Sequence, residues 1–397
     1  MKKVYLIANY FHFPTEKKSN RFCELAMMLA NDEAIELEVI TSHFYQRNYT
    51  YRENLDELRA QVPFKVTFVE ESSYCKSVSL KRLRACQVFG KNVLKYIKSQ
   101  PLPDLIYQAI PTLDVAYKVE KFAKKNHIPF VIDIQDLWPE AFKMALNIPV
   151  VSDLAFLPYT LESKSVYKKA DAICAVSKTY TNRALRENPS CKEVHPVFIG
   201  INLQKFDDAA RNNSVSKSNG ITLAYCGSLA KSYDIEYVID ALSLMDEPPY
   251  FLLMGDGNDK EKFEVYAKRK GVQAEFTGFL PYEQMCGRLC ACDMTINPII
   301  STSEASIINK HGDYCACGLP VLNTQRSQEY CDLVEEYNMG YNILSGNPQE
   351  LADMIQKLMD DEALRLEMGK NARRCAVEKF DRRTTYRELV DTVKRLL

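Results

Sequence analysis

Short runs of hydrophobic residues, rich in β-branched and aromatic side chains, alternate along the chain with segments of helical periodicity. In the first half, strands are predicted for KVYLIAN, IELEVITS, VTFVE, DLIYQAI, PFVIDI, DAICAVS (Asp171–Ser177) and HPVFIG (His195–Gly200). A helix is predicted from about residue 20 to residue 31. This alternation is typical of a parallel sheet with helices on both of its faces.

The alternation stops at the polar stretch DDAARNNSVSKSNG, residues 207–220, and then begins again. We expect this stretch to be an interdomain linker, because its polar, turn-forming residues favour neither a strand nor a helix. Strands of the second half are predicted for ITLAYCG, YFLLMG, AEFTGF, DMTINP, LPVLNT and YNIL, with helices between them. The chain ends in the amphipathic run TTYRELVDTVKRLL. The sequence therefore predicts two α/β domains of similar size.

Composition supports two ordinary globular domains. With 397 residues, 46% of them hydrophobic and 26% charged, the chain has enough apolar material for two cores. The formal net charge of −1 removes any overall electrostatic reason to bind nucleic acid.

The first hydrophobic run extends only from Val4 to Ala8, which suits a strand better than a signal peptide. No stretch approaches the ~18 apolar residues needed to span a bilayer. Thirteen cysteines, most in apolar segments, are typical of reduced thiols in a cytoplasmic protein.

Several common catalytic signatures are absent from the sequence. The chain has no GxGxxG after a strand, no Walker phosphate loop, no HExxH and no GxSxG. It also has no Asp-x-Asp pair that could hold a divalent metal on a nucleotide diphosphate. The pairs Cys290–Cys292 and Cys315–Cys317, with Cys286 and His311, suggest zinc, but their spacing is not C-x₂₋₄-C and their contexts are helical. We therefore expect no metal site.

The most informative segment is IINKHGDYCACGLPVLNT, residues 307–324, where a predicted helix leads into a glycine-containing turn and a buried strand. Lys310 and Asp313 are three residues apart and therefore lie on one face of that helix. An ammonium group can bind phosphate oxygens, and a carboxylate can accept hydrogen bonds from the two ribose hydroxyls. The pair therefore suits a nucleotide diphosphate; a surface ion pair is the alternative.

This segment resembles the carboxy-domain signature of glycosyltransferase family four, in particular its capsule and O-antigen branch, with the pattern S/N-K-x-x-[DE]-Y-x-A-x-G-x-P-V. The resemblance implies that Lys310 contacts the donor diphosphate and that Asp313 holds the ribose. In the family's wider pattern a Glu stands eight residues before the ribose-binding acid. That position is Ala305 here, next to Glu304.

The resemblance extends over nearly the whole chain, in the family's order. The other matching segments are DIQDLWPEA (133–141), KADAICAVSK (169–178), GINLQKF (200–206), YCGSLAKSYDIEYVIDAL (225–242), MGDGNDKEKF (254–263), FTGFLPYEQM (276–285) and MGKNARRCAVEKF (368–380). The resemblance implies the GT-B fold: two Rossmann-like parallel-sheet domains that face each other across a cleft. Residues 1–207 would bind the acceptor, residues 208–375 the nucleotide-sugar donor, and residues 376–397 would form a helix that packs back on the first domain.

The predicted donor site lies in loops that follow strand ends, where open α/β sheets bind their ligands. Free backbone amides of residues 227–229 and the dipole of the following helix should attract a diphosphate. Ser228 and Tyr233 occupy positions where the family commonly has basic residues, and Lys231 is displaced from that register. The donor-binding candidates are Gly227, Ser228, Leu229, Lys231, Gly255, Asp256, Gly257, Phe279, Leu280, Asn309, Lys310 and Asp313.

The predicted acceptor site lies in strand-end loops of the first domain. The acceptor-binding candidates are Asn9, His12, Arg21, Pro111, Asp136, Trp138 and Glu140. His12 is the candidate for a direct catalytic role alongside Lys310 and Asp313, although a positional role suits it as well. Trp138 is the only tryptophan; its ring could stack on a sugar face or pack in the core.

Residues 76–98 carry seven Lys or Arg and no acid, with Leu80, Leu83, Leu94 and Ile97 on one helical stripe. A basic amphipathic helix of this kind could rest on an anionic membrane, although a solvated helix face is equally compatible with the pattern.

The resemblance implies a retaining, metal-independent hexosyl or N-acetylhexosaminyl transferase. It would move a sugar from a UDP- or GDP-sugar to a glycan acceptor, lipid-linked and destined for a bacterial capsule, O-antigen or exopolysaccharide. No cofactor is expected beyond this co-substrate, and the protein would be cytoplasmic or peripheral on the inner face of the cytoplasmic membrane. The alternatives are a sugar-nucleotide epimerase of the same fold and a non-catalytic transferase-like binding protein.

Overall fold

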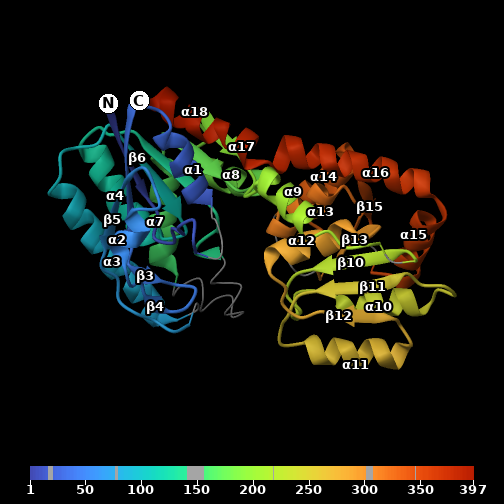
Figure 1. Ribbon diagram of the computed structural model, residues 1–397. Helices are drawn as coiled ribbons and strands as arrows, with labels where there is room; N and C mark the ends of the chain where they lie inside the picture. Colours follow the sequence, from blue (N-terminus) through green and yellow to red (C-terminus); the bar gives the residue numbers. More distant parts are fainter. Residues whose placement is uncertain (17–20, 77–78, 141–155, 218, 301–306, 345) are drawn as a thin grey trace. The chain divides into compact units, whose positions relative to one another are not determined.

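The computed structural model describes residues 1–16, 21–76, 79–140, 156–217, 219–300, 307–344 and 346–397, and the chain forms two compact units (Figure 1). Unit 1 comprises Met1–Phe198 together with Tyr386–Leu397, and unit 2 comprises Ile199–Thr385. The divisions therefore fall at 198/199 and 385/386, whereas the sequence analysis placed them at 207/208 and 375/376. The predicted α/β class, with a parallel sheet in each half, is confirmed.

Unit 1 is built on a seven-stranded parallel sheet in the order β5-β2-β1-β6-β7-β8-β9. Its strands are β1 (Lys2–Ile7), β2 (Ile35–Ser42), β5 (Lys65–Val69), β6 (Leu105–Ile110), β7 (Phe130–Ile134), β8 (Ala172–Ala175) and β9 (Glu193–Pro196). A strand was predicted at each of these places; the last is displaced toward the N-terminus from the predicted His195–Gly200. A short antiparallel pair, β3 (Phe44–Tyr45) and β4 (Thr50–Tyr51), was not predicted.

Successive residues of the central strand β1 face opposite sides of the sheet and belong to different hydrophobic cores. Tyr5 and Ile7 pack in one cluster with residues of α3 and α4, while Val4 and Leu6 pack in another with α1 and α18. The sheet is thus covered on both faces. The helices of unit 1 are α1 (Arg21–Ala30), α2 (Leu55–Arg59), α3 (Leu80–Lys98), α4 (Leu113–Lys125), α7 (Leu157–Lys168), α8 (Lys178–Leu185) and α18 (Arg387–Leu396).

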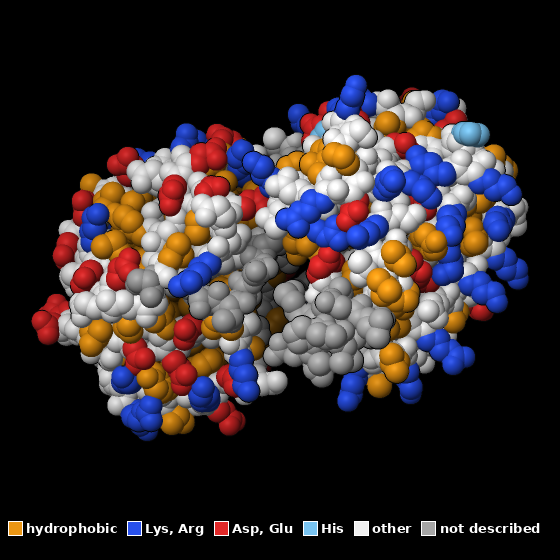
Figure 2. Space-filling model, turned by 180° about the vertical axis from the view of Figure 1, so that it is seen from behind, with side chains coloured by type: hydrophobic (Ala, Val, Ile, Leu, Met, Phe, Trp, Pro, Cys, Tyr) orange, Lys and Arg blue, Asp and Glu red, His pale blue; other side chains and the backbone are white. Residues whose placement is uncertain are grey.

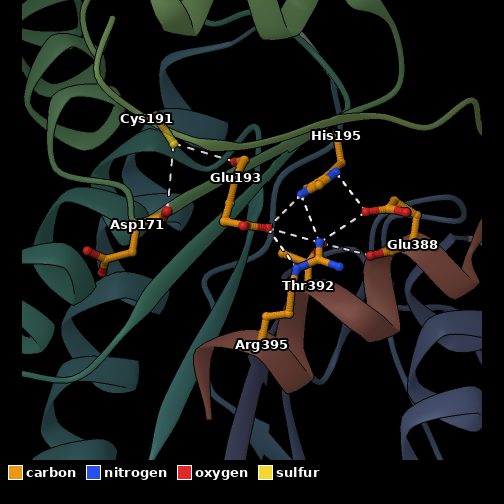
Figure 3. Close-up of polar contacts among 7 residues, drawn as sticks. All are labelled: Asp171, Cys191, Glu193, His195, Glu388, Thr392 and Arg395. Carbon is orange, nitrogen blue, oxygen red and sulfur yellow. Dashed lines mark hydrogen bonds and ion pairs between the residues drawn. The ribbon is translucent and has the colours of Figure 1, made fainter.

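The last helix, α18, returns to unit 1 and is joined to the edge strand β9 by a polar cluster (Figure 3). His195 Nε2 lies 3.0 Å from Glu193 Oε2, and His195 Nδ1 lies 2.9 Å from Glu388 Oε1. Arg395 donates to the same Glu193 oxygen at 3.0 Å and to Glu388 at 3.0 Å. Charged groups from residues almost 200 positions apart in the chain therefore fix the helix at the sheet edge.

Unit 2 contains a six-stranded parallel sheet in the order β12-β11-β10-β13-β14-β15. Figure 1 labels the first four of these strands in this order, from β12 to β13. Its strands are β10 (Thr222–Cys226), β11 (Tyr250–Met254), β12 (Ala274–Phe276), β13 (Met294–Asn297), β14 (Val321–Asn323) and β15 (Gly340–Asn342). Numbered within the unit, the order is 3-2-1-4-5-6, which is the Rossmann arrangement. The order reverses between β10 and β13, so a ligand site is expected beyond the carboxyl ends of these two strands.

The helices of unit 2 are α9 (Leu203–Asn212), α10 (Ile235–Ser243), α11 (Lys260–Lys270), α12 (Tyr282–Cys290), α13 (Asn309–Cys317), α14 (Gln328–Glu336), α15 (Pro348–Asp360), α16 (Glu362–Cys375), the π-helical turn η1 (Ala376–Phe380) and α17 (Arg382–Thr385). Helix α9 corrects the linker prediction, because residues 207–212 are helical. Asn202 caps this helix by accepting from the Lys205 amide at 3.0 Å. Leu203, Phe206 and Ala209 are buried, and this apolar stripe ends inside the stretch predicted to be a linker. In the part of the chain that the structure describes, no helix has the length and apolarity needed to cross a bilayer.

Candidate functional site

Three loops of unit 2 follow the carboxyl ends of β10, β11 and β12 and pack on one another. The Gly227 amide donates to Met254 O at 3.0 Å, and the Leu229 amide donates to Asp256 O at 2.9 Å. Gly255 and Gly278 form a β-bridge that joins the second loop to the third. A Cβ at Gly255 would collide with the carbonyl oxygen of Gly227. These glycines therefore let backbone pack directly on backbone.

This packing corrects the expectation of three free amides in residues 227–229. Two of the three amides donate to Met254, at the end of β11, and to Asp256, in the second loop. The side chain of Leu229 is fully buried in the core. Helix α10 begins only at Ile235, where the Asp234 carboxylate caps it by accepting from the Tyr237 amide at 3.2 Å. The loop amides and the helix dipole are thus weaker attractors for an anion than the sequence analysis assumed.

Lys310, near the start of α13, supplies the positive charge at this loop. Its side chain is 9% exposed, and its Nζ has no hydrogen-bond partner within the described residues. The ammonium lies 4.2 Å from the ring centroid of Tyr225 and 3.9 Å from that of Tyr233. Because Gly227 (φ 146°) has no Cβ, Nζ can approach it; a Cβ there would lie 2.8 Å from Nζ. Burial lowers the pKa of Lys310 to about 7.

Asp313, one turn further along α13, is half-buried and accepts a hydrogen bond from Tyr282 Oη at 2.8 Å. The alternative of a surface ion pair between Lys310 and Asp313 is wrong, because Lys310 is buried and its ammonium forms no hydrogen bond in the described part of the chain. An unpaired buried cation beside a glycine loop is costly unless an anion joins it. The arrangement can therefore bind a phosphate group.

The remaining donor candidates lie on or near the surface of the three loops. Ser228, Lys231, Asp256 and Asn309 are exposed, and Phe279 is 72% exposed. Asp256 also accepts from the Gly257 amide at 2.8 Å, which closes the second loop. Leu280 is half-buried. Ala305 and Glu304 lie outside the described residues. Tyr225 was not among the predicted site residues, and Tyr233 was noted only as a departure from the family's basic residue.

Of the residues that suggested zinc in the sequence, His311 has other partners. His311 is buried, its Nδ1 accepts from the Ile308 amide at 3.3 Å, and its ring stacks on Tyr330 at 3.6 Å between centroids. Burial and the nearby Lys310 hold the pKa of His311 well below its usual value. Within the described ranges, no three His, Cys, Asp or Glu side chains are grouped so that they could hold a metal ion. All thirteen cysteines are free thiols.

In unit 1 the strand order reverses between β1 and β6, which places the residues after these strands at the corresponding edge. Asn9 is buried there, and its carbonyl accepts from Thr41 Oγ1 at 3.3 Å. Pro111 is half-buried. His12 is half-buried and lies edge-on to the Tyr45 ring, 5.6 Å away. These residues are near the predicted edge but largely enclosed.

Trp138 is 3% exposed and belongs to the hydrophobic core, which favours the packing interpretation over sugar stacking. The Arg82 guanidinium lies 4.8 Å from the centroid of the Trp138 ring, and Trp138 Nε1 donates to Asp136 Oδ2 at 3.2 Å. Glu140 accepts from Arg183 at 2.7 Å. The contacts of these acceptor candidates are therefore mostly internal.

Arg21 is fully buried and pairs with Asp133 at 2.7 Å. Tyr107 donates to the same carboxylate at 2.6 Å, and the Tyr386 ring lies 5.2 Å from the guanidinium. This network joins α1, two strands and the start of the C-terminal segment, which favours a structural role. Glu71, which lies after β5, was not among the predicted site residues. Burial raises the pKa of Glu71 to about 7.

The basic helix predicted at residues 76–98 is α3, but its apolar stripe is not free. Ile97 is fully buried, and Leu83 and Leu94 pack against the unit 1 core; only Leu80, 84% exposed, projects into solvent. Its basic side chains are exposed at Lys81, Arg84, Lys91, Lys95 and Lys98. On the face that Figure 2 shows, Lys and Arg side chains (blue) gather over the right-hand part of the surface. Elsewhere on this face they are mixed with Asp and Glu side chains (red).

Residues 206–375 match the family model described as "Glycosyl transferases group 1". The chain is 24% identical over 243 residues to "Uncharacterized glycosyltransferase MJ1069" of Methanocaldococcus jannaschii, covering 59% of this chain and 61% of that protein. It is 26% identical over 185 residues to "Putative colanic acid biosynthesis glycosyl transferase WcaI" of Escherichia coli, covering 43% of this chain and 44% of that protein. The matches thus span less than two thirds of the length of either relative.

Among solved structures, the crystal structure of Anabaena Alr3699/HepE in complex with UDP is similar over 100% of both chains, with a TM-score of 0.69 and 16% identity. At this identity the likeness shows the fold, which is that of the GT-B glycosyltransferases. The matched residues 206–375 lie wholly within unit 2, which carries the Lys310 site. The resemblance recognised in the sequence is confirmed: residues 206–375 match the model of the group 1 glycosyl transferases, and the chain has the GT-B fold.

Proposed function

We propose that this protein is a retaining glycosyltransferase that moves a hexosyl or N-acetylhexosaminyl residue from a UDP- or GDP-sugar to a glycan acceptor. The observation that carries the proposal is the buried Lys310 ammonium, unpartnered within the described residues and placed against Gly227 at the switch point of the unit 2 sheet. A diphosphate would supply the missing counter-charge. The UDP complex of the structurally similar Anabaena protein supports this choice of ligand.

The other groups of the site have roles that suit this ligand. Asp313 accepts hydrogen bonds from the ribose hydroxyls, and the exposed Phe279 lies in the loop that would adjoin the base. Lys310 neutralises charge on the departing diphosphate, so the reaction needs no metal ion. The bond from the anomeric carbon to the diphosphate breaks, a bond to the acceptor hydroxyl oxygen forms on the same face, and the departing oxygen takes the hydroxyl proton.

The acceptor belongs, in this proposal, to a lipid-linked glycan in the synthesis of a surface polysaccharide such as a capsule, an O-antigen or an exopolysaccharide. The similarity to WcaI, whose name refers to colanic acid biosynthesis, supports a polysaccharide. The exposed basic residues of α3 would hold the protein peripherally on the anionic inner face of the cytoplasmic membrane. Since the apolar stripe of this helix is packed in the core, charge alone would provide that contact.

The donor is tested by calorimetry of the purified protein with UDP, GDP, CDP and ADP and with their common sugar conjugates. We expect one nucleoside diphosphate to bind, and Asp313→Ala to weaken that binding at least tenfold. Asp353→Ala is the matched control, because Asp353 is an exposed acid on α15 of the same unit, and it should bind as the parent does.

Two results would overturn the proposal. If the folded protein bound none of the nucleotides, it would be a non-catalytic relative of the transferases. If it consumed a sugar nucleotide at the same rate without any acceptor, releasing an altered sugar, it would be an epimerase.

A further inference from the structure

Two tyrosines enclose the Lys310 ammonium. Tyr225 belongs to β10 and is fully buried, and its hydroxyl donates to Ser228 O at 2.7 Å. Tyr233 lies in the segment before α10, is half-buried, and forms an antiparallel bridge with Ile299 after β13. The two rings meet edge-on, with centroids 5.7 Å apart and an interplanar angle of 63°. Backbone contacts to the two strands at the switch point therefore fix both rings.

Among the described residues, the groups around Lys310 leave its charge uncompensated. Tyr225 and Cys226 face it from β10, Tyr233 from the loop, and His311 and Asp313 from its own helix. Burial keeps the thiol of Cys226 protonated by raising its pKa well above the usual value, and His311 is neutral. Asp313, the one carboxylate among these groups, accepts from Tyr282. Aromatic rings attract a cation through their quadrupole but do not neutralise it.

We propose that Tyr225 and Tyr233 are positioning residues for the donor: their rings hold the Lys310 ammonium at the Gly227 loop, and a nucleoside diphosphate binds there together with a proton. The inference rests on the proposed function and adds a residue pair and a proton to it. In the sequence, Tyr233 stands where related transferases commonly have a basic residue.

The proton follows from the burial of Lys310. Because the pKa of Lys310 is about 7 without ligand, part of the population is neutral at pH 7 and most is neutral at pH 8.5. A bound diphosphate stabilises the charged form and raises this pKa, so binding takes up a proton. Affinity should therefore fall as pH rises above 7, by up to about tenfold for each pH unit.

The test is calorimetry with UDP between pH 7 and pH 9, a range above the ionisation of a terminal phosphate at about 6. Repeating it in buffers of different ionisation enthalpy counts the protons taken up. Tyr233→Leu removes the ring but keeps apolar volume, and Tyr233→Phe is its matched control. We expect Tyr233→Leu to bind UDP about 2- to 30-fold more weakly and to move the midpoint of the pH profile downward, with Tyr233→Phe close to the parent in both.

The outcomes separate this inference from the proposed function. If Tyr233→Leu matched Tyr233→Phe in affinity and in pH midpoint, or if the parent took up no proton, the inference would be wrong while nucleotide binding stood. If the parent did not bind UDP or any other nucleoside diphosphate, the proposed function itself would fail. Tyr225→Phe adds a further check, because it keeps the ring, loses the bond to Ser228 and should retain the proton uptake.

Discussion

At the scale of single residues, the packing of the three loops after β10, β11 and β12 depends on glycine at positions where a side chain has no room. Gly255 lies against the Gly227 carbonyl and Gly257 against the Leu229 carbonyl. In both cases the obstacle is backbone, which cannot rotate away as a flexible side chain would. These glycines therefore fix the shape of the loop that Lys310 approaches.

Gly255→Ala should lower the free energy of unfolding by about 1–3 kcal/mol, because a methyl group forced into close-packed surroundings displaces them. Gly220→Ala is the matched control: a Cβ at Gly220 meets nothing within 4 Å, and its effect should stay within about 0.5 kcal/mol. Urea unfolding monitored by circular dichroism measures both. Equal stabilities of the two variants would show that the three loops do not pack as described.

At the scale of elements, the strands could be predicted because buried parallel strands are short, continuous hydrophobic runs. Helix α9 was not predicted, since its buried face depends on only Leu203, Phe206 and Ala209 among polar residues. The stripe of α3 was correctly assigned to a helix, but its partner, the core of unit 1, could not be read from the pattern. Periodicity identifies an apolar face and does not identify what covers it.

Helix α18 offers an element-scale test, because it completes a hydrophobic core of unit 1 from the far end of the chain. Leu389 is fully buried in that core, so Leu389→Ala should cost about 2–5 kcal/mol of unfolding free energy. Leu366→Ala on α16, where the leucine is 58% exposed, should cost less than about 0.5 kcal/mol. Denaturant titration compares them. A small loss at Leu389 would mean that α18 does not pack on the unit 1 sheet.

At the scale of the whole molecule, burial opposes the charge of Glu71 in unit 1 and of Lys310 in unit 2. The spacing of Lys310 and Asp313 in the sequence led to the proposed donor site. However, Tyr225 and Tyr233 come together only through the folded order β10-β13, which no local pattern reports. Glu71 in unit 1 was missed for the same reason, since a single Glu after a strand carries no sign of burial. The burial and the spatial neighbours of each residue therefore could not be predicted from the sequence.

These two groups give the protein opposite pH dependences. The pKa of Glu71 is raised from 4.5 to about 7, so the folded state holds the extra proton between these values and stability falls as pH rises toward 7. The pKa of Lys310 is lowered from 10.5 to about 7, so the unfolded state holds the extra proton and stability rises with pH above 7. Each contribution is on the order of 3–5 kcal/mol across its window.

Unfolding free energies of the ligand-free protein from pH 5 to pH 9.5 would test this through Glu71→Gln and Lys310→Met. Each variant removes one titration, so we expect the stability difference between Glu71→Gln and the parent to change mainly below pH 7.5. The difference for Lys310→Met should change mainly above pH 7, in the opposite direction. Since every other titrating group is common to both proteins in each comparison, a difference that stayed constant with pH would show that the substituted side chain is hydrated in the folded state rather than buried.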